Sequence, residues 1–270
     1  MLRKTLGSIY KFVIRRVAYP YSVYKRLGAY WLLNKCTSMD EAFIKFKPYE
    51  EGMIEYASDA IKLRDIDCVY DIGANIGYYS VMLGLMSTVK SVWSFEPLPA
   101  LHLQVGSNVL INGLVDKWHG FKCALGNRAG TEDIYFHPYW LGTSSLQQGW
   151  VGRSKESLSV SVEVFDEIIS ANGERCFLKI DVEGSEVSVL AGMQRFLRAN
   201  DVFMQIEAAG ENAAIVCQML ERLGYVLVGR PSEVDYYFSN FAIDKRLVGA
   251  ANSTDRRNTL GKSFSGCFVV

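Results

Sequence analysis

The chain has 270 residues, of which 49% are apolar and 21% charged, and this composition excludes collagen-like, low-complexity and disordered proteins. Basic and acidic residues balance at 29 each, but residues 1–39 contain eight basic residues and no acidic one, so the remainder is net acidic. The six cysteines form no C-x-x-C pair, and no apolar run approaches the roughly 20 residues of a membrane-spanning helix. Charges also interrupt every apolar core that would suit a signal peptide. We therefore expect a cytoplasmic protein with buried, reduced thiols.

Residues 1–50 form the first predicted unit, a basic and aromatic helical arm. Apolar residues recur at helical spacing from Leu6 to Val17, with the basic residues largely off that face, and Pro20 is expected to break the helix. Three interpretations of residues 1–35 stay open: packing on the main domain or in a homo-oligomer, peripheral contact with an anionic membrane at its inner face, and nucleic-acid binding. No recognition motif accompanies the charge, so we expect no nucleic-acid partner.

Residues 51–240 form the second predicted unit, in which strands and helices alternate. The predicted strands cover residues 67–71, 91–95, 120–125, 131–137, 158–164, 176–182, 202–208, 225–229 and 236–238. The predicted helices cover residues 76–87, 101–112, 165–171, 185–199 and 212–223. This order predicts an α/β fold with a doubly wound, mostly parallel sheet, and a turn at Pro231 makes the last strand antiparallel. Residues 241–270 are expected to form a loosely packed C-terminal tail.

The strongest local motif is Asp71-Ile-Gly-Ala-Asn-Ile-Gly-Tyr-Tyr-Ser80, between a predicted strand and a predicted helix. Gly73 permits a tight turn and close approach of the backbone to a ligand, toward which the following helix points its first N–H groups. Glu96 ends the next strand, where a carboxylate can accept both hydroxyls of a ribose. The motif therefore predicts a nucleoside site at the carboxyl ends of adjacent strands.

The residues of this motif distinguish between two nucleoside cofactors. A dinucleotide loop has the spacing G-x-G-x-x-G, whereas Asn75 stands here between Gly73 and Gly77, and Tyr78 fills a position that suits a small residue. Asp71 would repel a diphosphate but attract an ammonium group. S-adenosylmethionine has an ammonium group, a ribose and a sulfonium but no phosphate, so we predict this cofactor rather than NAD. The alternative, in which the glycines only turn a strand into a helix, stays open.

The chain resembles the FkbM-type methyltransferase family over roughly residues 67–208. The resemblance is carried, in the family's order, by residues 71–80, 95–99 (FEPLP), 112–113 (NG), 124–126 (ALG), 142–146 (GTSSL) and 178–184 (LKIDVEG). It implies a class I Rossmann-like methyltransferase that usually acts on hydroxyl oxygens, with sugars and secondary metabolites as common acceptors. Residues 1–50 and 241–270 lie outside the resemblance.

The resemblance also implies cofactor-binding residues through their positions in these motifs. Four belong to the glycine-containing loop, two to the stretch with the ribose-binding acid, two to the strand beside the adenine ring, and one to a loop near the cofactor. For the adenine strand and the last loop, a plain core strand and a polar turn are the alternatives. The implied cofactor-binding residues are Asp71, Gly73, Asn75, Gly77, Glu96, Leu98, Ala124, Leu125 and Ser144.

A second group of ionisable residues follows the strand predicted at residues 176–182. Period-two alternation places Lys179, Asp181 and, if the strand continues, Glu183 on one side, where they are costly unless paired or functional. A sugar hydroxyl is a poor nucleophile until its proton leaves, so a general base is expected. Asp181 and Glu183 are the candidates, with His137 as the third. An ion pair of Lys179 with either carboxylate is the structural alternative, and no metal ligands are assigned, although a divalent metal stays open.

These features together predict an S-adenosylmethionine-dependent O-methyltransferase. The expected acceptor is a hydroxyl of a sugar in a glycan, a glycolipid or a glycosylated metabolite. An NAD-dependent oxidoreductase and a catalytically inactive binding domain are the alternatives.

Overall fold

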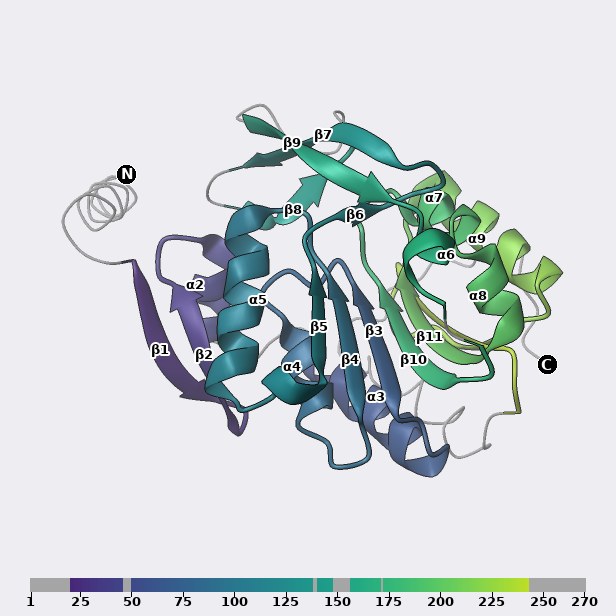
Figure 1. Ribbon diagram of the computed structural model, residues 1–270, viewed down its shortest axis with the longest axis horizontal. Coiled ribbons are helices and arrows are strands. Elements are labelled where there is room, and N and C mark those ends of the chain that lie inside the picture. The colour runs from purple at the N-terminus through teal and green to yellow at the C-terminus, as the bar shows by residue number, and fades with distance from the viewer. Residues whose placement is uncertain (1–19, 46–49, 138–139, 148–155, 171, 243–270) are drawn as a thin grey trace.

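The computed structural model describes residues 20–45, 50–137, 140–147, 156–170 and 172–242. Its centre is a seven-stranded sheet with helices on both faces (Figure 1), in which all strands except β13 run in the same direction. This confirms the predicted doubly wound sheet and its antiparallel last strand. The strands lie in the order β12 (Val226–Gly229), β13 (Asp235–Ser239), β11 (Asp201–Glu207), β10 (Arg175–Ile180), β3 (Cys68–Ile72), β4 (Ser91–Phe95) and β5 (Trp118–Phe121).

The central strands are buried on both faces, because alternate side chains enter two separate hydrophobic cores. Val69 and Phe177 belong to one core, and their neighbours Tyr70 and Leu178 belong to the other. The first core is covered by α3 (Glu51–Leu63), α4 (Tyr78–Gly84) and α5 (Pro99–Ile111); the second is covered by α6 (Phe165–Ile168), α7 (Glu186–Ala191), α8 (Gln194–Ala199) and α9 (Gly210–Arg222). The strand order reverses between β3 and β10, where doubly wound sheets open a crevice.

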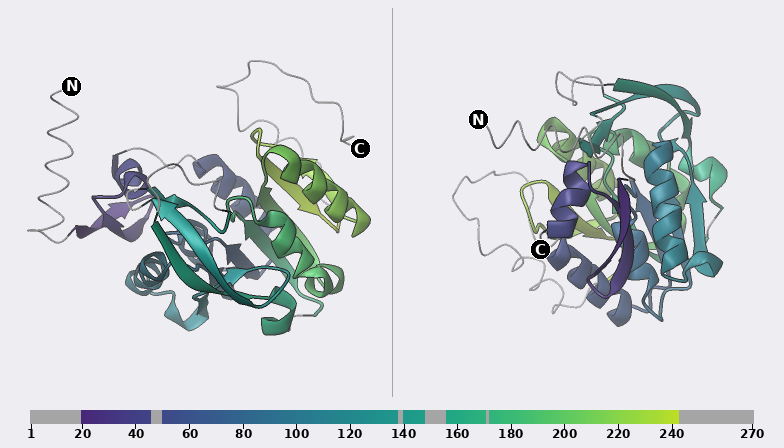
Figure 2. Two further views of the ribbon diagram at one scale, coloured as in Figure 1. Left: turned by 90° about the horizontal axis from the view of Figure 1, so that it is seen from above. Right: turned by 90° about the vertical axis from the view of Figure 1, so that its left-hand side faces the viewer.

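A second, smaller sheet lies across the carboxyl edge of the main sheet (Figure 2). Its strands lie in the order β6 (Ala124–Leu125), β9 (Glu156–Glu163), β7 (Gly130–His137) and β8 (Trp140–Ser145). The prediction of a single strand at residues 120–125 is therefore wrong. Its first half belongs to β5, which follows the short helix η1 (Val115–Lys117), and its second half belongs to β6 in the smaller sheet. The N–H of Glu96 donates the last hydrogen bond of the ladder between β4 and β5, to the carbonyl oxygen of Phe121. Pro97 has no N–H, so it cannot continue this ladder.

The single helix predicted at residues 185–199 is also divided, into α7 and α8. The break falls at Gly192, where the carbonyl oxygen of Gly126 lies so close that any side chain would overlap it. The carbonyl oxygen of Gly192 also accepts a hydrogen bond from the N–H of Asp166. The helix is thus interrupted by a loop that packs against it, which the helical periodicity alone does not reveal.

The N-terminal segment corrects the prediction of a helical arm. Among the described residues of this arm only α2 (Ser38–Lys45) is helical, whereas β1 (Tyr21–Arg26) and β2 (Ala29–Asn34) form an antiparallel hairpin. Leu27 and Gly28 both have positive φ, as a two-residue hairpin turn requires. Alternate residues of β2 are buried, so the segment has strand rather than helix periodicity. The helix predicted around residues 6–17 lies outside the described residues.

The hairpin packs on α5 (Figure 2, right) and shares the first hydrophobic core with the main sheet. Asn108 of α5, which is fully buried, accepts a hydrogen bond from the N–H of Leu32 at 2.6 Å and donates one to the carbonyl oxygen of Ile76 at 2.8 Å. Asn112, one turn further on, bonds both backbone groups of Tyr30. The division into residues 1–50, 51–240 and 241–270 stays a prediction, although these contacts join the hairpin closely to the sheet.

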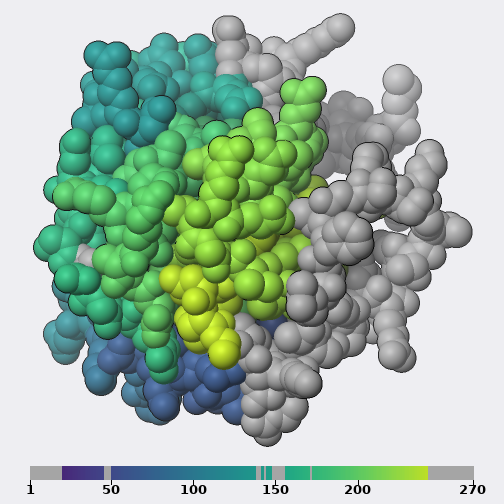
Figure 3. All heavy atoms as spheres, turned by 90° about the vertical axis from the view of Figure 1, so that its right-hand side faces the viewer, coloured from purple at the N-terminus to yellow at the C-terminus, as the bar shows by residue number. Residues whose placement is uncertain are grey.

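The predictions from composition concern the cysteines, the membrane and the tail. The cysteines in the described part of the chain are buried, and none of its helices is long and apolar enough to cross a bilayer. Figure 3 shows the end of the molecule opposite the hairpin, where the yellow-green C-terminal part of the described chain lies at the surface. The predicted tail falls outside the described residues from position 243 onward.

Asn108→Ala is expected to destabilise the protein by about 2–3 kcal/mol, because the buried carbonyl oxygen of Ile76 and the partly buried N–H of Leu32 each lose a hydrogen bond. Asn112→Ala is the matched control and should cost less than about 1 kcal/mol, since water can reach its half-exposed site. Urea unfolding followed by circular dichroism measures both. Equal losses would show that the hairpin is not held through the buried amide.

Candidate active site

A pocket opens above the carboxyl ends of β3, β4 and β10, with about 640 Å³ of empty space that includes open solvent. The main sheet forms its floor and the small sheet forms its opposite wall. The lining residues are Ile72, Gly73, Asn75, Phe95, Glu96, Pro97, Leu101, Cys123, Ala124, Leu125, Ile134, Leu141, Gly142, Ser144, Leu146, Asp181, Val182, Glu183 and Ser185.

The glycine loop, residues 73–77, leaves β3 at the centre of this floor. Gly73, Asn75 and Gly77 all have positive φ, so the loop coils back on itself before α4 begins. The N–H groups of Gly73 and the following residue both donate to the carbonyl oxygen of Phe95. A Cβ atom built on Gly73 would overlap the carbonyl oxygen of Asp181, so only glycine fits between the two loops.

Asp71 lies beneath the loop and does not line the pocket. Its Oδ2 accepts hydrogen bonds from the N–H of Ser80 at 3.0 Å and from the hydroxyl of Ser80 at 2.5 Å. Burial raises the pKa of Asp71 to about 6, although the bonds from Ser80 act in the opposite direction. The carboxylate therefore holds α4 against β3. Asp71 is therefore not among the lining residues, and its predicted contact with a ligand ammonium group stays a prediction.

Glu96 is the buried carboxylate that does line the pocket, with an exposed fraction of 5%. Its Oε2 accepts a hydrogen bond from the N–H of Asn75 at 2.9 Å, and its Oε1 accepts one from the N–H of Leu98 at 2.9 Å. Burial raises its pKa to about 7, against the effect of these two bonds. Each oxygen keeps a second lone pair, so the carboxylate can accept two hydroxyl donors side by side.

The small sheet supplies the apolar wall of the pocket. Ala124 and Leu125 of β6 line it, and so do Ile134 of β7 and Leu141 of β8. Ser144, also in β8, turns its hydroxyl back to the carbonyl oxygen of Leu141 at 2.5 Å. Apolar side chains of the small sheet therefore line the same pocket as Glu96.

The carboxylate loop, residues 181–184, follows β10 and brings Asp181 and Glu183 into the pocket. Glu183 and Gly184 have positive φ, which turns the chain sharply before α7. Ser145 donates to the carbonyl oxygen of Glu183 at 2.6 Å, and the side-chain amide of Gln147 donates to that of Gly184 at 2.5 Å. The small sheet therefore holds this loop directly.

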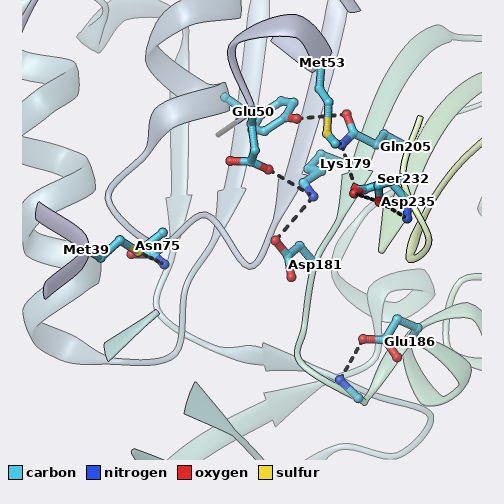
Figure 4. Close-up of polar contacts among 12 residues, drawn as sticks. Met39, Glu50, Met53, Asn75, Lys179, Asp181, Glu186, Gln205, Ser232 and Asp235 are labelled. Atoms are coloured by element: carbon cyan, nitrogen blue, oxygen red, sulfur yellow. Dashed lines mark hydrogen bonds and ion pairs between the residues drawn. The ribbon is translucent and has the colours of Figure 1, made fainter. Parts of the chain in front are cut away.

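A buried lysine lies behind the carboxylate loop (Figure 4). Lys179 is 2% exposed, and its ammonium nitrogen lies 3.3 Å from Oδ2 of Asp181 and 3.6 Å from Oε1 of Glu50. Although burial opposes it, the nearby carboxylates raise the pKa of Lys179, so this side chain is a cation and not a base. The predicted ion pair is present, and Glu50 adds a third member.

Of the twelve residues predicted from the sequence, eight line one pocket: Gly73, Asn75, Glu96, Ala124, Leu125, Ser144, Asp181 and Glu183. Asp71 and Gly77 shape the glycine loop from below, and Leu98 contributes its N–H to Glu96. His137, which pairs with Trp140 at the end of β7, is not among the lining residues. Its role as a base stays a prediction.

Sequence reasoning missed Glu50 and Met39. Glu50 precedes α3 and belongs to no motif, so only the packing of α3 on the sheet reveals it. Met39 of α2 was missed as well: its sulfur accepts a hydrogen bond from the side-chain amide of Asn75 at 3.1 Å. In the part of the chain that the structure describes, no three His, Cys, Asp or Glu residues are grouped as a metal site.

Comparison with known proteins identifies the domain. The sequence model of the methyltransferase FkbM domain matches residues 71–227. The 31-O-demethyl-FK506 methyltransferase FkbM of Streptomyces tacrolimicus is 28% identical over 171 residues, covering 52% of this chain and 64% of that protein. The hexuronic acid methyltransferase AglP of Haloferax volcanii is 27% identical over 147 residues, covering 53% and 56%. A crystal structure of methyltransferase FkbM from Methylobacillus flagellatus has a TM-score of 0.45 at 23% identity, covering 65% and 43%. The matched regions thus span less than two thirds of these three proteins.

Gly73→Ala is expected to destabilise the protein by at least about 2 kcal/mol for two reasons. An alanine at this position has an unfavourable positive φ, and its Cβ atom overlaps the backbone of Asp181. Gly130→Ala is the control, since a Cβ atom there meets no neighbour and should change stability by less than about 0.5 kcal/mol. Chemical denaturation measures both. A Gly73→Ala protein as stable as wild type would mean that the two loops are further apart than described.

Proposed function

This chain belongs to the FkbM methyltransferase family, and we propose that it is an S-adenosylmethionine-dependent O-methyltransferase acting on a sugar hydroxyl. The observation that carries the proposal is the placement of Glu96. Its buried carboxylate lines the pocket together with the glycine loop and with apolar residues of the small sheet, and each of its oxygens accepts a hydrogen bond from a backbone N–H group. A ribose diol with an aromatic base beside it fits this arrangement.

The residues of the pocket fit S-adenosylmethionine better than a dinucleotide. The described lining residues include three carboxylates, Glu96, Asp181 and Glu183, and no lysine or arginine. A diphosphate would therefore enter a negatively charged pocket without a side-chain cation, whereas a sulfonium and an ammonium group would be attracted. Glu96 would hold the ribose, Ala124 and Leu125 the adenine, and the glycine loop the amino-acid part.

The chemistry requires the chain to position a hydroxyl and to accept its proton. When bound, the cofactor supplies an electrophilic methyl group on sulfur, which needs no further activation. Asp181 and Glu183 project from the carboxylate loop into the same pocket, so either can orient an acceptor hydroxyl and take its proton as the oxygen–carbon bond forms.

The acceptor class is proposed from the relatives. One is named for methylation at an oxygen of 31-O-demethyl-FK506, and another for methylation of a hexuronic acid. Hydroxyl oxygen is common to both kinds of compound. A sugar hydroxyl is the acceptor that we propose for this chain, and its ring position is an outcome of the assays below.

Adenosylhomocysteine, the product form of the cofactor, is expected to bind roughly tenfold more weakly at pH 6 than at pH 8. The pKa of Glu96 is raised to about 7, so its carboxylate is ionised above this pH and loses an acceptor site as it protonates below it. Glu96→Gln should bind more weakly at pH 8 and should lose this pH dependence. Isothermal titration calorimetry measures the affinity.

Glu167→Gln, which neutralises an exposed carboxylate of α6, is the control and should retain the wild-type pH dependence. Calorimetry with NAD under the same conditions tests the competing cofactor. Tight binding of NAD without binding of adenosylhomocysteine would overturn the proposal.

Asp181→Asn and Glu183→Gln are expected to lower kcat, by on the order of 100-fold or more for the residue that is the base. Affinity for adenosylhomocysteine should change by less than about threefold, because Glu96 and the glycine loop remain intact. Transfer of a labelled methyl group to a panel of neutral hexoses, deoxyhexoses and hexuronic acids measures activity. Asp116→Asn on the exposed helix η1 is the control. Wild-type turnover in both carboxylate variants would remove them from the proton-transfer role.

A further inference from the structure

We propose that Met39 is a positioning residue for the cofactor, which orients the side-chain amide of Asn75 so that its oxygen accepts a hydrogen bond from the ammonium group of S-adenosylmethionine. The inference rests on the proposed function, in which the glycine loop holds the amino-acid part of this cofactor. Met39 belongs to α2 and lies 32 positions before the start of the family match at residue 71. The segment that precedes the family domain thus completes its cofactor site.

Three segments from different parts of the chain meet at the sulfur of Met39. This sulfur accepts a hydrogen bond from the side-chain amide nitrogen of Asn75 at 3.1 Å (Figure 4). A Cβ atom built on Gly142 of β8 would lie 2.5 Å from the sulfur and 3.2 Å from the same amide nitrogen. Asn75 and Gly142 both line the pocket, so Met39 contacts the wall of the proposed cofactor site.

The chemistry of the thioether fixes which end of the Asn75 amide lies next to Met39. A methionine sulfur only accepts hydrogen bonds, whereas an asparagine side chain has a donor NH2 group at one end and an acceptor oxygen at the other. The NH2 group therefore takes the position next to the sulfur, and Oδ1 takes the other position of the planar amide. Oδ1 is buried, and among the described residues none donates a hydrogen bond to it.

The oxygen of Asn75 therefore lacks a donor, and a buried acceptor without one is unfavourable. A ligand can supply the donor, because Asn75 lines the pocket. In the proposed function the ribose hydroxyls bind Glu96, and the adenine lies beside Ala124 and Leu125. The ammonium group remains for the glycine loop. It offers only donors, so it can pair with the oxygen of Asn75 but not with the NH2 group.

Contacts that do not involve Met39 hold α2 in place. Asp40 is 2% exposed, and its Oδ2 accepts a hydrogen bond from the side-chain amide of Gln104 on α5 at 2.7 Å. The centre of the Phe43 ring lies 5.6 Å from that of Tyr78, the first residue of α4. Met39 itself is 40% exposed. A substitution at this position therefore changes the contact with the glycine loop and leaves the packing of α2 intact.

The test compares adenosylhomocysteine with its analogue in which hydrogen replaces the amino group, by isothermal titration calorimetry at pH 8. Met39→Leu removes the acceptor of the amide and should weaken binding of adenosylhomocysteine roughly three- to tenfold, whereas binding of the analogue should change by less than about twofold. Met39→Gln, whose side-chain oxygen can accept the same hydrogen bond, should restore the affinity at least in part. Met219→Leu on α9 is the matched control and should bind both ligands as wild type does.

A double-mutant cycle tests whether Met39 acts through Asn75. Asn75→Ala should weaken binding of adenosylhomocysteine at least as much as Met39→Leu does, and the two substitutions together should cost no more than Asn75→Ala alone. Additive losses, an equal loss for the two ligands in Met39→Leu, or wild-type affinity in that variant would overturn the inference. Wild-type protein that binds neither ligand would overturn the proposed function and the inference together. Binding without methyl transfer to any sugar would overturn only the proposed acceptor.

Discussion

The site depends on one close contact, between the backbone of Gly73 and the carbonyl oxygen of Asp181. β3 and β10 are parallel neighbours at the point where the strand order reverses, and the N–H of Asp181 donates to Ile72, one residue before the glycine. The glycine loop and the carboxylate loop therefore start from a single hydrogen-bonded pair of strand ends. Any larger side chain at position 73 would push the two loops apart. It would thereby also separate the groups proposed to bind the cofactor from those proposed to bind the acceptor.

Around this contact the protein buries charges, which is unfavourable unless each is compensated. Glu96 is compensated by two backbone N–H groups, Asp71 by Ser80, and Lys179 by two carboxylates. The compensation is incomplete for the carboxylates, because burial still raises the pKa of both Glu96 and Asp71. A carboxyl group whose pKa is raised in this way changes its protonation readily when a hydroxyl or ammonium group binds beside it, as the groups of binding and catalytic sites commonly do.

The strands of the main sheet and most of its helices could be predicted, because buried strands and amphipathic helices leave regular apolar patterns. Glu96 and the glycine loop could be predicted for a related reason: their chemistry is confined to a few neighbouring residues at strand ends. Asp71 shows the limit of this approach. An acid before a glycine turn suits both ligand binding and the holding of a helix, and only the tertiary structure shows its bonds to Ser80. His137 was chosen for its proximity to Ser144 in the sequence, whereas the structure does not place it among the residues that line the pocket.

The sequence by itself determined the fold class, the two loops that meet at the switch point, and the family, since each is encoded by local periodicity or by a short motif. Tertiary structure decided what depends on contacts between distant segments. It turned residues 21–34 into a hairpin on α5, divided residues 118–125 between two sheets, and brought Glu50 to Lys179 across 129 positions of the chain. Such contacts are fixed by packing and by the compensation of buried charge, neither of which has a period or a spacing along the chain.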